Sequence, residues 1–323
     1  MPRLLRYREL DLTAWDACVA SAREGLPYAC SWWLHATAGR WDALVEVEAS
    51  TGRYLAVWPL PVKWRLGGWE VYQPLFTQQL GAYSRAEEAG QLSSLSMLNM
   101  DRLIPRYTRF YAQLNDANKY PTQLLLGHVG KPSLLVQRRQ TYHLPLEAPY
   151  DVLRATYAAD YRRRLRQHEN ASAPLAIADT ADAEALLQLF QQTKGPEAGL
   201  KPRHYRTLRR LIIALRQRNL LEVYEARQPG TGALLAGALF VRYRQRLIYL
   251  FAAASPEGKK AAAPLVLLDA AIRRHAGTPG LILDFEGSMI PSIARFFANF
   301  GATPVCYAAL SFTQRPWYLQ WMR

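Results

Sequence analysis

Two carboxylates near the C-terminus offer the clearest candidate chemistry in this sequence. Asp284 and Glu286 stand two residues apart in the phrase LILDFEG, which ends a short apolar segment expected to be a strand. Alternation along a strand would place both carboxylates on one face and Phe285 on the other. Carboxylates in that position can act as a general base or orient an amine. The structural alternative is that Glu286 or Ser288 caps the helix that follows.

A second candidate is the segment SPEGKKAAAP, residues 255–264, which links an expected strand to an expected helix. Small residues, a helix N-terminus and two lysines together suit a phosphate or a pyrophosphate. An ordinary surface turn is the alternative, because the segment matches neither GxGxxG nor GxxxxGK[ST]. The candidate phosphate-binding residues are Ser255, Gly258, Lys259, Lys260 and Ala261.

A basic segment in the middle of the chain, with ADYRRRLRQHEN at its centre, predicts a helix over residues 155–170. Its arginines are expected to face a cleft between two domains and to bind an anionic part of the substrate. A solvated helix face is the alternative for such a run of charges. The candidate substrate contacts are Tyr161, Arg162, Arg163 and Arg166, together with Trp32 from the first half of the chain.

A repeated pattern indicates how these residues are positioned. Residues 46–64 and 222–243 each combine a short alternating segment, a Thr-Gly turn and a longer segment that ends on an aromatic residue. Each is followed by a third β-rich segment, at 69–75 and at 247–254. An antiparallel meander therefore occurs twice, which predicts two copies of one fold, with chance similarity of hairpins as the alternative.

After the second meander we expect a loop, a helix over residues 264–276, a strand at 281–285, a helix at 291–300 and a final strand at 305–312. The sequence thus predicts a mixed α/β fold in two domains, residues 1–150 and 151–323. In each domain an antiparallel meander continues into a βαβ unit with flanking helices. A sheet that is antiparallel first and parallel later has a place where strands part, and ligands favour such places.

Composition and charge limit the classes of protein. Half of the 323 residues are hydrophobic and 20% are charged, as in packed globular proteins. No apolar run reaches the roughly 20 residues of a membrane span, and no secretory signal is evident, so we expect a cytoplasmic protein. Three scattered cysteines predict neither a disulfide framework nor a metal site.

Positive charge is concentrated in the second half. Residues 1–150 carry 16 Lys and Arg against 13 Asp and Glu, whereas residues 151–323 carry 24 against 13. A basic field raises the local concentration of phosphate-bearing partners. The partners that remain open are a nucleotide cofactor, a tRNA, a lipid-linked phosphate and, through transient contact, an anionic membrane surface. No motif points to DNA.

These motifs resemble the GNAT acyltransferase fold, and more closely its FemAB-like branch, which contains peptidoglycan-bridge aminoacyltransferases and related acyltransferases built from two tandem GNAT-like domains. YRRRLRQ at 161–167 is similar to the basic RRNxR helix of that branch, although Arg164 stands where the branch commonly has Asn. The segment 255–264 follows the Q/R-x-x-G-x-G/A pyrophosphate loop only loosely. The other matching stretches are SWW at 31–33, residues 237–255, LDFEG at 283–287 and RFFANFG at 295–301.

The resemblance implies an N-acyltransferase that moves an acyl or aminoacyl group from acyl-coenzyme A or aminoacyl-tRNA to an amine, for example on a cell-envelope precursor. It places the donor on the second domain and the acceptor on the first, with no tightly bound cofactor. Such transfer needs a proton acceptor, for which Glu286 and then Asp284 are the candidates. Tyr249 or Tyr307 could donate to the leaving group, although strand aromatics are more often core.

Two functions from other classes remain open. One is a catalytically inactive GNAT-like module that binds RNA or an anionic glycolipid. The other is a nucleic-acid-binding protein unrelated to acyl transfer, which the charge allows but no RNA-binding motif supports.

Overall fold

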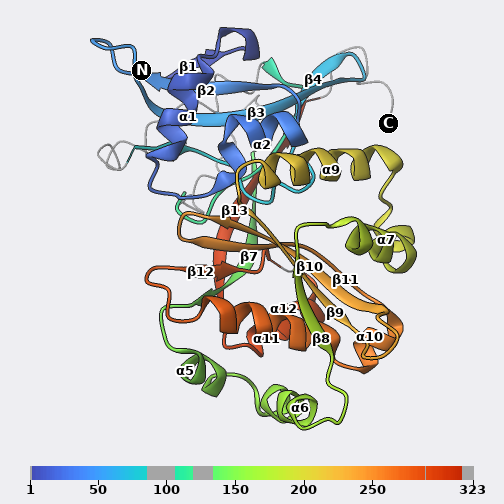
Figure 1. Cartoon of the computed structure of the whole chain (residues 1–323). Coiled ribbons are helices and arrows are strands. Elements are labelled where there is room, and N and C mark those ends of the chain that lie inside the picture. The colour runs from blue at the N-terminus through green and yellow to red at the C-terminus, as the bar shows by residue number, and fades with distance from the viewer. Residues whose placement is uncertain (1, 86–105, 119–133, 288, 315–323) are drawn as a thin grey trace. The chain divides into compact units, whose positions relative to one another are not determined.

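The structure is a computed structural model, and it describes residues 2–85, 106–118, 134–287 and 289–314 (Figure 1). The chain forms two compact units. The first unit comprises residues 1–139 and 306–323, and the second unit comprises residues 140–305. Across the described residues, every helix is too short or too polar to serve as a membrane span.

The first unit is a small sheet with helices before and between its strands. Its helices are α1 (Leu12–Ala20) and α2 (Ser31–Thr37), with 3-10 turns at Tyr7–Glu9 and Pro27–Ala29. Its strands are β1 (Arg3–Leu5), β2 (Trp41–Val47), β3 (Tyr54–Arg65), β4 (Gly68–Val71), β5 (Tyr83–Ser84), β6 (Arg109–Gln113) and most of β13 (Thr303–Thr313). Its core is rich in tryptophan, since Trp15, Trp33, Trp41 and Trp58 are all buried.

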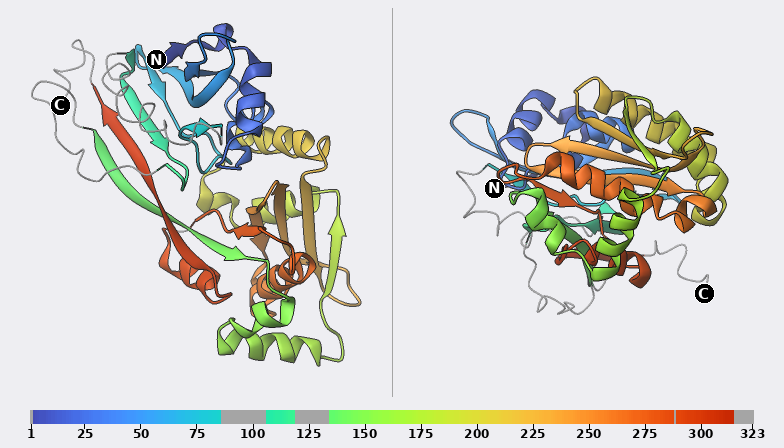
Figure 2. Two further views of the ribbon diagram at one scale, coloured as in Figure 1. Left: turned by 90° about the vertical axis from the view of Figure 1, so that its left-hand side faces the viewer. Right: turned by 60° about the horizontal axis from the view of Figure 1, so that its bottom comes forward.

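The second unit is a sheet with helices on both faces, and Figure 2 shows its strands from two further directions. The strands are most of β7 (Leu135–Pro145), β8 (Ala176–Thr180), β9 (Leu221–Arg227), β10 (Leu234–Tyr243), β11 (Arg246–Ala254) and β12 (Ile282–Asp284). The helices are α5 (Tyr150–Ala155), α6 (Ala159–Glu169), α7 (Glu184–Thr193), α8 (Gly195–Ala198), α9 (Pro202–Arg216), α10 (Pro256–Lys260), α11 (Ala263–His275) and α12 (Pro291–Ala298).

Both units share one pattern of strand pairing, which confirms the predicted repeat. In the first unit β1, β2, β3 and β4 pair antiparallel in that order, β4 pairs parallel with β6, and β6 pairs antiparallel with β13. In the second unit β8, β9, β10 and β11 pair antiparallel, β11 pairs parallel with β12, and β12 pairs antiparallel with β7. The two meanders are therefore equivalent parts of two similar sheets.

The last strand of each sheet is exchanged between the units. β7 follows β6 along the chain, yet it pairs with β12 of the second unit. β13 follows β12, yet it pairs with β6 of the first unit. The compact units therefore change over at residues 139 and 305, whereas the expected domains 1–150 and 151–323 assumed that each half keeps its own strands. The acceptor and donor roles of those domains stay a prediction.

Amphipathic helices close the core of the second unit. α9 has one apolar face, because Leu208, Leu211 and Leu215 are buried while several arginines of the same helix are exposed. α11 buries most of its side chains against the sheet and ends in Arg273, Arg274 and His275, which complement the negative end of the helix dipole.

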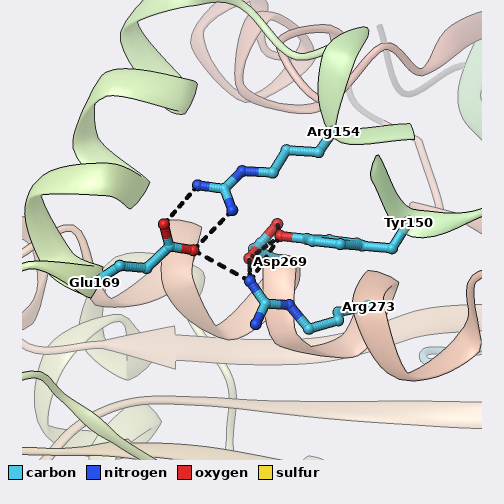
Figure 3. Close-up of polar contacts among 5 residues, drawn as sticks. All are labelled: Tyr150, Arg154, Glu169, Asp269 and Arg273. Carbon is cyan, nitrogen blue, oxygen red and sulfur yellow. Dashed lines mark hydrogen bonds and ion pairs between the residues drawn. The ribbon is translucent and has the colours of Figure 1, made fainter. Parts of the chain in front are cut away.

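A polar cluster joins α5, α6 and α11 (Figure 3). Arg154 donates to both oxygens of Glu169 at 2.7 and 2.8 Å, and Arg273 donates to Glu169 at 3.1 Å. The Tyr150 hydroxyl donates to Asp269 at 2.8 Å and accepts from Arg273 at 3.0 Å. Burial raises the pKa of the Asp269 carboxyl and raises that of Tyr150 to about 12. The cluster fixes the C-terminal end of α6 against α11.

Candidate active site

A cavity of about 610 Å³ lies in the second unit where β11 and β12 part. The parallel pairing of the two strands ends at Ile248 and Asp284, but β11 continues to Ala254. Residues 249–254 of β11 all line the cavity, together with residues of α6, α11 and α12. The cavity is therefore at the kind of position that the strand order predicted, where a parallel pair opens.

A β-bulge shapes the β11 wall of this cavity. The pairing of β10 with β11 shifts register between Leu239 and Phe240, which leaves Leu250 as an extra residue between Tyr249 and Phe251. A bulge turns neighbouring side chains away from strict alternation, so successive residues of β11 can face one space. Burial raises the pKa of the Tyr249 hydroxyl above its ordinary value. The described residues offer that hydroxyl no hydrogen-bond partner.

Glu286 lines the cavity on a turn with an unusual backbone. Its φ is +55°, in the left-handed region that side chains other than glycine rarely adopt. Two hydrogen bonds hold the turn: the Glu286 N–H donates to Asp284 Oδ1 at 2.9 Å, and the Gly287 N–H donates to Thr141 Oγ1 at 2.8 Å. The strand ends at Asp284, so alternation does not continue to Glu286. The expectation that the two carboxylates share a face was wrong, since Phe285 and Glu286 line the cavity and Asp284 does not.

Asp284 is instead a buried support of that turn, with 1% of its surface exposed. It accepts from Thr141 Oγ1 at 2.6 Å and lies 3.3 Å from His143 Nε2. Burial alone would raise the pKa of Asp284, but the hydrogen bond and charge of His143 and the charge of Arg246 outweigh it and hold that pKa below its usual value. Asp284 is thus a positioning residue for Glu286, not a side chain that faces the cavity.

The capping alternative for Glu286 concerns the start of α12. α12 begins at Pro291 with Ile290 as its N-cap, and the Ile290 side chain makes no capping hydrogen bond. Ser288, the other candidate cap, lies outside the described residues. Glu286 lines the cavity and its backbone has an unfavourable conformation, so it stays a candidate for a role at the site.

α6 presents a different arginine to the cavity from those that we expected. Tyr161 and Arg164 line the cavity, as does Asp160, whose carboxylate lies 2.9 Å from Arg164 Nε. Arg163 is exposed and pairs with Asp160 at 2.5 Å, but it does not line the cavity. Arg162 and Arg166 border a shallow depression outside the cavity, next to α5. Helical spacing could have pointed to Arg164, because it lies one turn from Tyr161 on the inward face.

The segment SPEGKKAAAP is not the loop that we expected. Residues 256–260 form α10, and the Ser255 side chain caps it by accepting from the Gly258 N–H at 2.9 Å. Gly258 is buried, and a Cβ atom there would lie 2.1 Å from the Leu235 carbonyl oxygen. The Gly258 amide already has a hydrogen-bond partner in Ser255 Oγ. The absence of a side chain at Gly258 allows the close approach to Leu235. Of the five expected phosphate contacts, Lys259 lines the cavity, and Ser255, Gly258, Lys260 and Ala261 do not.

Lys194, between α7 and α8, is a cavity residue that sequence reasoning missed. Burial lowers the pKa of its ammonium group, and the charge of Lys259 lowers it further. Two lysines that repel each other at one cavity wall form a site suited to an anion. No local sequence pattern predicts that Lys194 lies at the cavity, because its neighbour Lys259 comes from α10 and not from its own segment.

Tyr307 and Trp32 both lie in the first unit. The Tyr307 hydroxyl donates to Gln113 Oε1 at 3.1 Å. The Trp32 ring packs against Trp33 on α2, with 5.6 Å between the ring centroids. Neither side chain is among those that line the cavity of the second unit.

Part of the chain that contains this cavity is similar to a known family of domains. Residues 155–287, which contain the cavity walls of α6, β11 and β12, match the model of the acetyltransferase (GNAT) domain. No curated protein is significantly similar in sequence to the chain.

Solved structures extend the likeness to nearly the whole chain. The fold resembles that of FemX with a TM-score of 0.66 at 12% identity, covering 97% of this chain and 98% of that one. It also resembles a GNAT-family acetyltransferase from Colwellia psychrerythraea (TM-score 0.53, 12% identity, 97% and 100% covered). A tandem GNAT protein from the clavulanic acid biosynthesis pathway matches with a TM-score of 0.50 at 15% identity, with 98% and 99% covered. Residues 155–287 are therefore similar to a GNAT acetyltransferase domain, and the fold of the whole chain resembles that of tandem-GNAT structures.

Proposed function

We propose that the protein is an N-acyltransferase that transfers an acyl group from a coenzyme A thioester to an amine, in the cavity of the second unit. The observation that carries this proposal is that Glu286, Tyr249 and Lys259 line one cavity at the parting of two parallel strands. A proton acceptor, a proton donor and a cation for the donor's phosphates are the groups that such a transfer uses. An aminoacyl-tRNA donor and an acceptor on a cell-envelope precursor are finer alternatives within the same reaction class.

The exposed edge of β11 suits an extended, amide-containing donor. Beyond Ile248 that edge has no partner strand among the described residues, so its backbone groups can pair with a ligand as with an added strand. Lys259 and Lys194 then lie on the walls of the same cavity and can contact phosphates. The thioester would lie nearer to Glu286, because a carboxylate repels phosphate groups.

In the proposed reaction the amine nitrogen bonds to the thioester carbonyl carbon while Glu286 accepts the proton that the amine loses. The carbon–sulfur bond then breaks, and the neutral Tyr249 hydroxyl donates a hydrogen bond or a proton to the departing thiolate. The raised pKa of Tyr249 favours its protonated form at the start of the reaction. Asp284 takes no part in these transfers and holds the turn on which Glu286 sits.

The experiment uses the whole chain and acetyl-coenzyme A with a panel of amines, read as product mass. Glu286→Gln should keep affinity for acetyl-coenzyme A but lower turnover by about 100-fold or more. Lys259→Ala should weaken that affinity and reduce its salt dependence, whereas Lys260→Ala, one residue away but outside the cavity, is the matched control and should not. Full turnover by Glu286→Gln would refute the assignment of the base.

An inactive GNAT-like module that binds an anionic glycolipid or RNA is the second candidate. The observation that favours it is the occupied Gly258 amide, because a helix turn closed by its own cap offers that amide to no phosphate. The same experiment separates the two functions. Measurable affinity for acetyl-coenzyme A that depends on Lys259 supports the enzyme, and RNA binding with no affinity for acetyl-coenzyme A supports the module.

A further inference from the structure

The hairpin between β3 and β4 of the first unit (Figure 1) has exposed apolar side chains at its tip. Arg65 pairs with Gly68, so the turn contains two residues, Leu66 and Gly67, with φ values of +48° and +78°. Positive φ at both positions defines a type I′ turn, which normally takes Asn, Asp or Gly. Leu66 is 72% exposed and Trp64 is 61% exposed. Leucine is thus unfavourable here both for its backbone conformation and for its exposure.

The repeat within this chain shows that the fold does not need this leucine. The equivalent hairpin, between β10 and β11 of the second unit, also has a two-residue turn, because Tyr243 pairs with Arg246. Its turn residues are Arg244 and Gln245, and Arg244 has a φ of +50°. The equivalent two-residue turn of the second unit is therefore built from polar residues, with a positive φ at Arg244 but not at Gln245, whereas the turn of the first unit carries an exposed leucine. A function at the tip explains the difference.

Aromatic and basic side chains surround the tip. Trp64 contacts Trp69 across the hairpin, with 5.4 Å between the ring centroids, and the Arg40 guanidinium lies 5.1 Å from the centroid of Trp69. Lys63 and Arg65 flank Trp64 along the strand and are exposed. Next to Trp69 a groove is lined by Arg6, Tyr7, Arg8 and Arg40. Among the described residues, neither Arg8 nor Arg65 has an ion-pair partner.

We propose that this hairpin tip docks on an anionic phospholipid membrane, with Leu66 and Trp64 entering the headgroup region and the basic residues contacting lipid phosphates. Tryptophan favours the membrane–water boundary, and basic residues beside it are attracted to anionic lipids. A protein partner fits less well, because a stable protein interface buries about 800 Å² on each side and a two-residue tip offers far less apolar surface. The proposal does not depend on acyl transfer.

The test is cosedimentation of the whole chain with phosphatidylcholine vesicles, with and without phosphatidylglycerol. The wild-type protein should bind the anionic vesicles, and Arg65→Gln should bind about fivefold more weakly, the usual effect of one basic residue near the surface. Leu66→Asn should bind about tenfold more weakly, because burial of most of a leucine side chain is lost. Since Asn suits a type I′ turn, the melting temperature of Leu66→Asn should equal or exceed that of the wild type.

Leu75→Asn is the matched control, because Leu75 is an exposed leucine of the same unit outside the hairpin. It should bind like the wild type. Equal binding of Leu66→Asn and wild type would overturn the proposal, as would equal binding to neutral and anionic vesicles. Lipid-independent self-association that Leu66→Asn abolishes would overturn it in favour of a second copy of the chain. If Leu66→Asn lowers the melting temperature, Trp64→Thr is the variant to compare with the wild type, because Thr suits a strand. Equal vesicle binding of Trp64→Thr and the wild type would then overturn the proposal.

Discussion

Replacement of Glu286 by glycine should move stability and activity in opposite directions. Glu286 holds a φ of +55°, and the left-handed conformation costs a residue with a side chain about 1–2 kcal/mol. Glycine avoids that cost but loses about 0.5–1 kcal/mol through its greater freedom in the unfolded chain. The backbone hydrogen bond from residue 286 to Asp284 is kept, because it uses the N–H group. Glu286→Gly should therefore raise the free energy of unfolding by roughly 0.5–1 kcal/mol.

The assay is urea unfolding of the whole chain beside turnover with acetyl-coenzyme A. Glu286→Gly should lose turnover as Glu286→Gln does, while Glu286→Gln, which keeps the strained backbone, should leave stability unchanged. Arg244→Gly is a control for the backbone effect, because Arg244 has a similar φ of +50° away from the cavity. It should gain stability and keep activity. A loss of more than about 1 kcal/mol in Glu286→Gly would mean that the Glu286 side chain stabilises the fold, and our reasoning would be refuted.

Two further predictions concern the supports of the site. Gly258→Ala should lower the melting temperature markedly, because its Cβ would lie 2.1 Å from the Leu235 carbonyl oxygen; an unchanged melting temperature would show that Gly258 is not needed for packing. Asp284→Asn should cost about 3–5 kcal/mol at pH 7, since His143 loses its buried partner. The folded pKa of Asp284 lies below its usual 3.8, so this stabilisation is present above that pH and is lost as pH falls through the folded value. In urea unfolding the difference between variant and wild type should shrink below about pH 4, and a constant difference would contradict the assignment.

Local pattern was enough to predict the repeated sheet. Hydrophobic alternation and turn residues are properties of neighbours in sequence, and they located both meanders and the helix–strand–helix–strand order that follows the second. That order in turn predicted a place where parallel strands part, and it brought Tyr249 and Glu286 to the same cavity. The exchange of β7 and β13 was not predictable in this way, because nothing local tells a strand which of two similar sheets it will join.

The sequence by itself determined the class of fold, and it pointed to the end of the strand at residues 281–285 and to the basic helix as parts of a candidate site. The tertiary structure decided which of these residues face the cavity. It buries Asp284 beside His143, and it places Glu286 at the cavity on a turn with a positive φ. It places Arg164 at the cavity instead of Arg162, Arg163 or Arg166, and adds Lys194 from the turn between α7 and α8. The Ser255 side chain occupies the Gly258 amide. The reason is physical: strand period and helix period report a side chain's face only within regular structure. At the ends of β11 and β12 the regular structure stops, and packing between distant segments sets each direction.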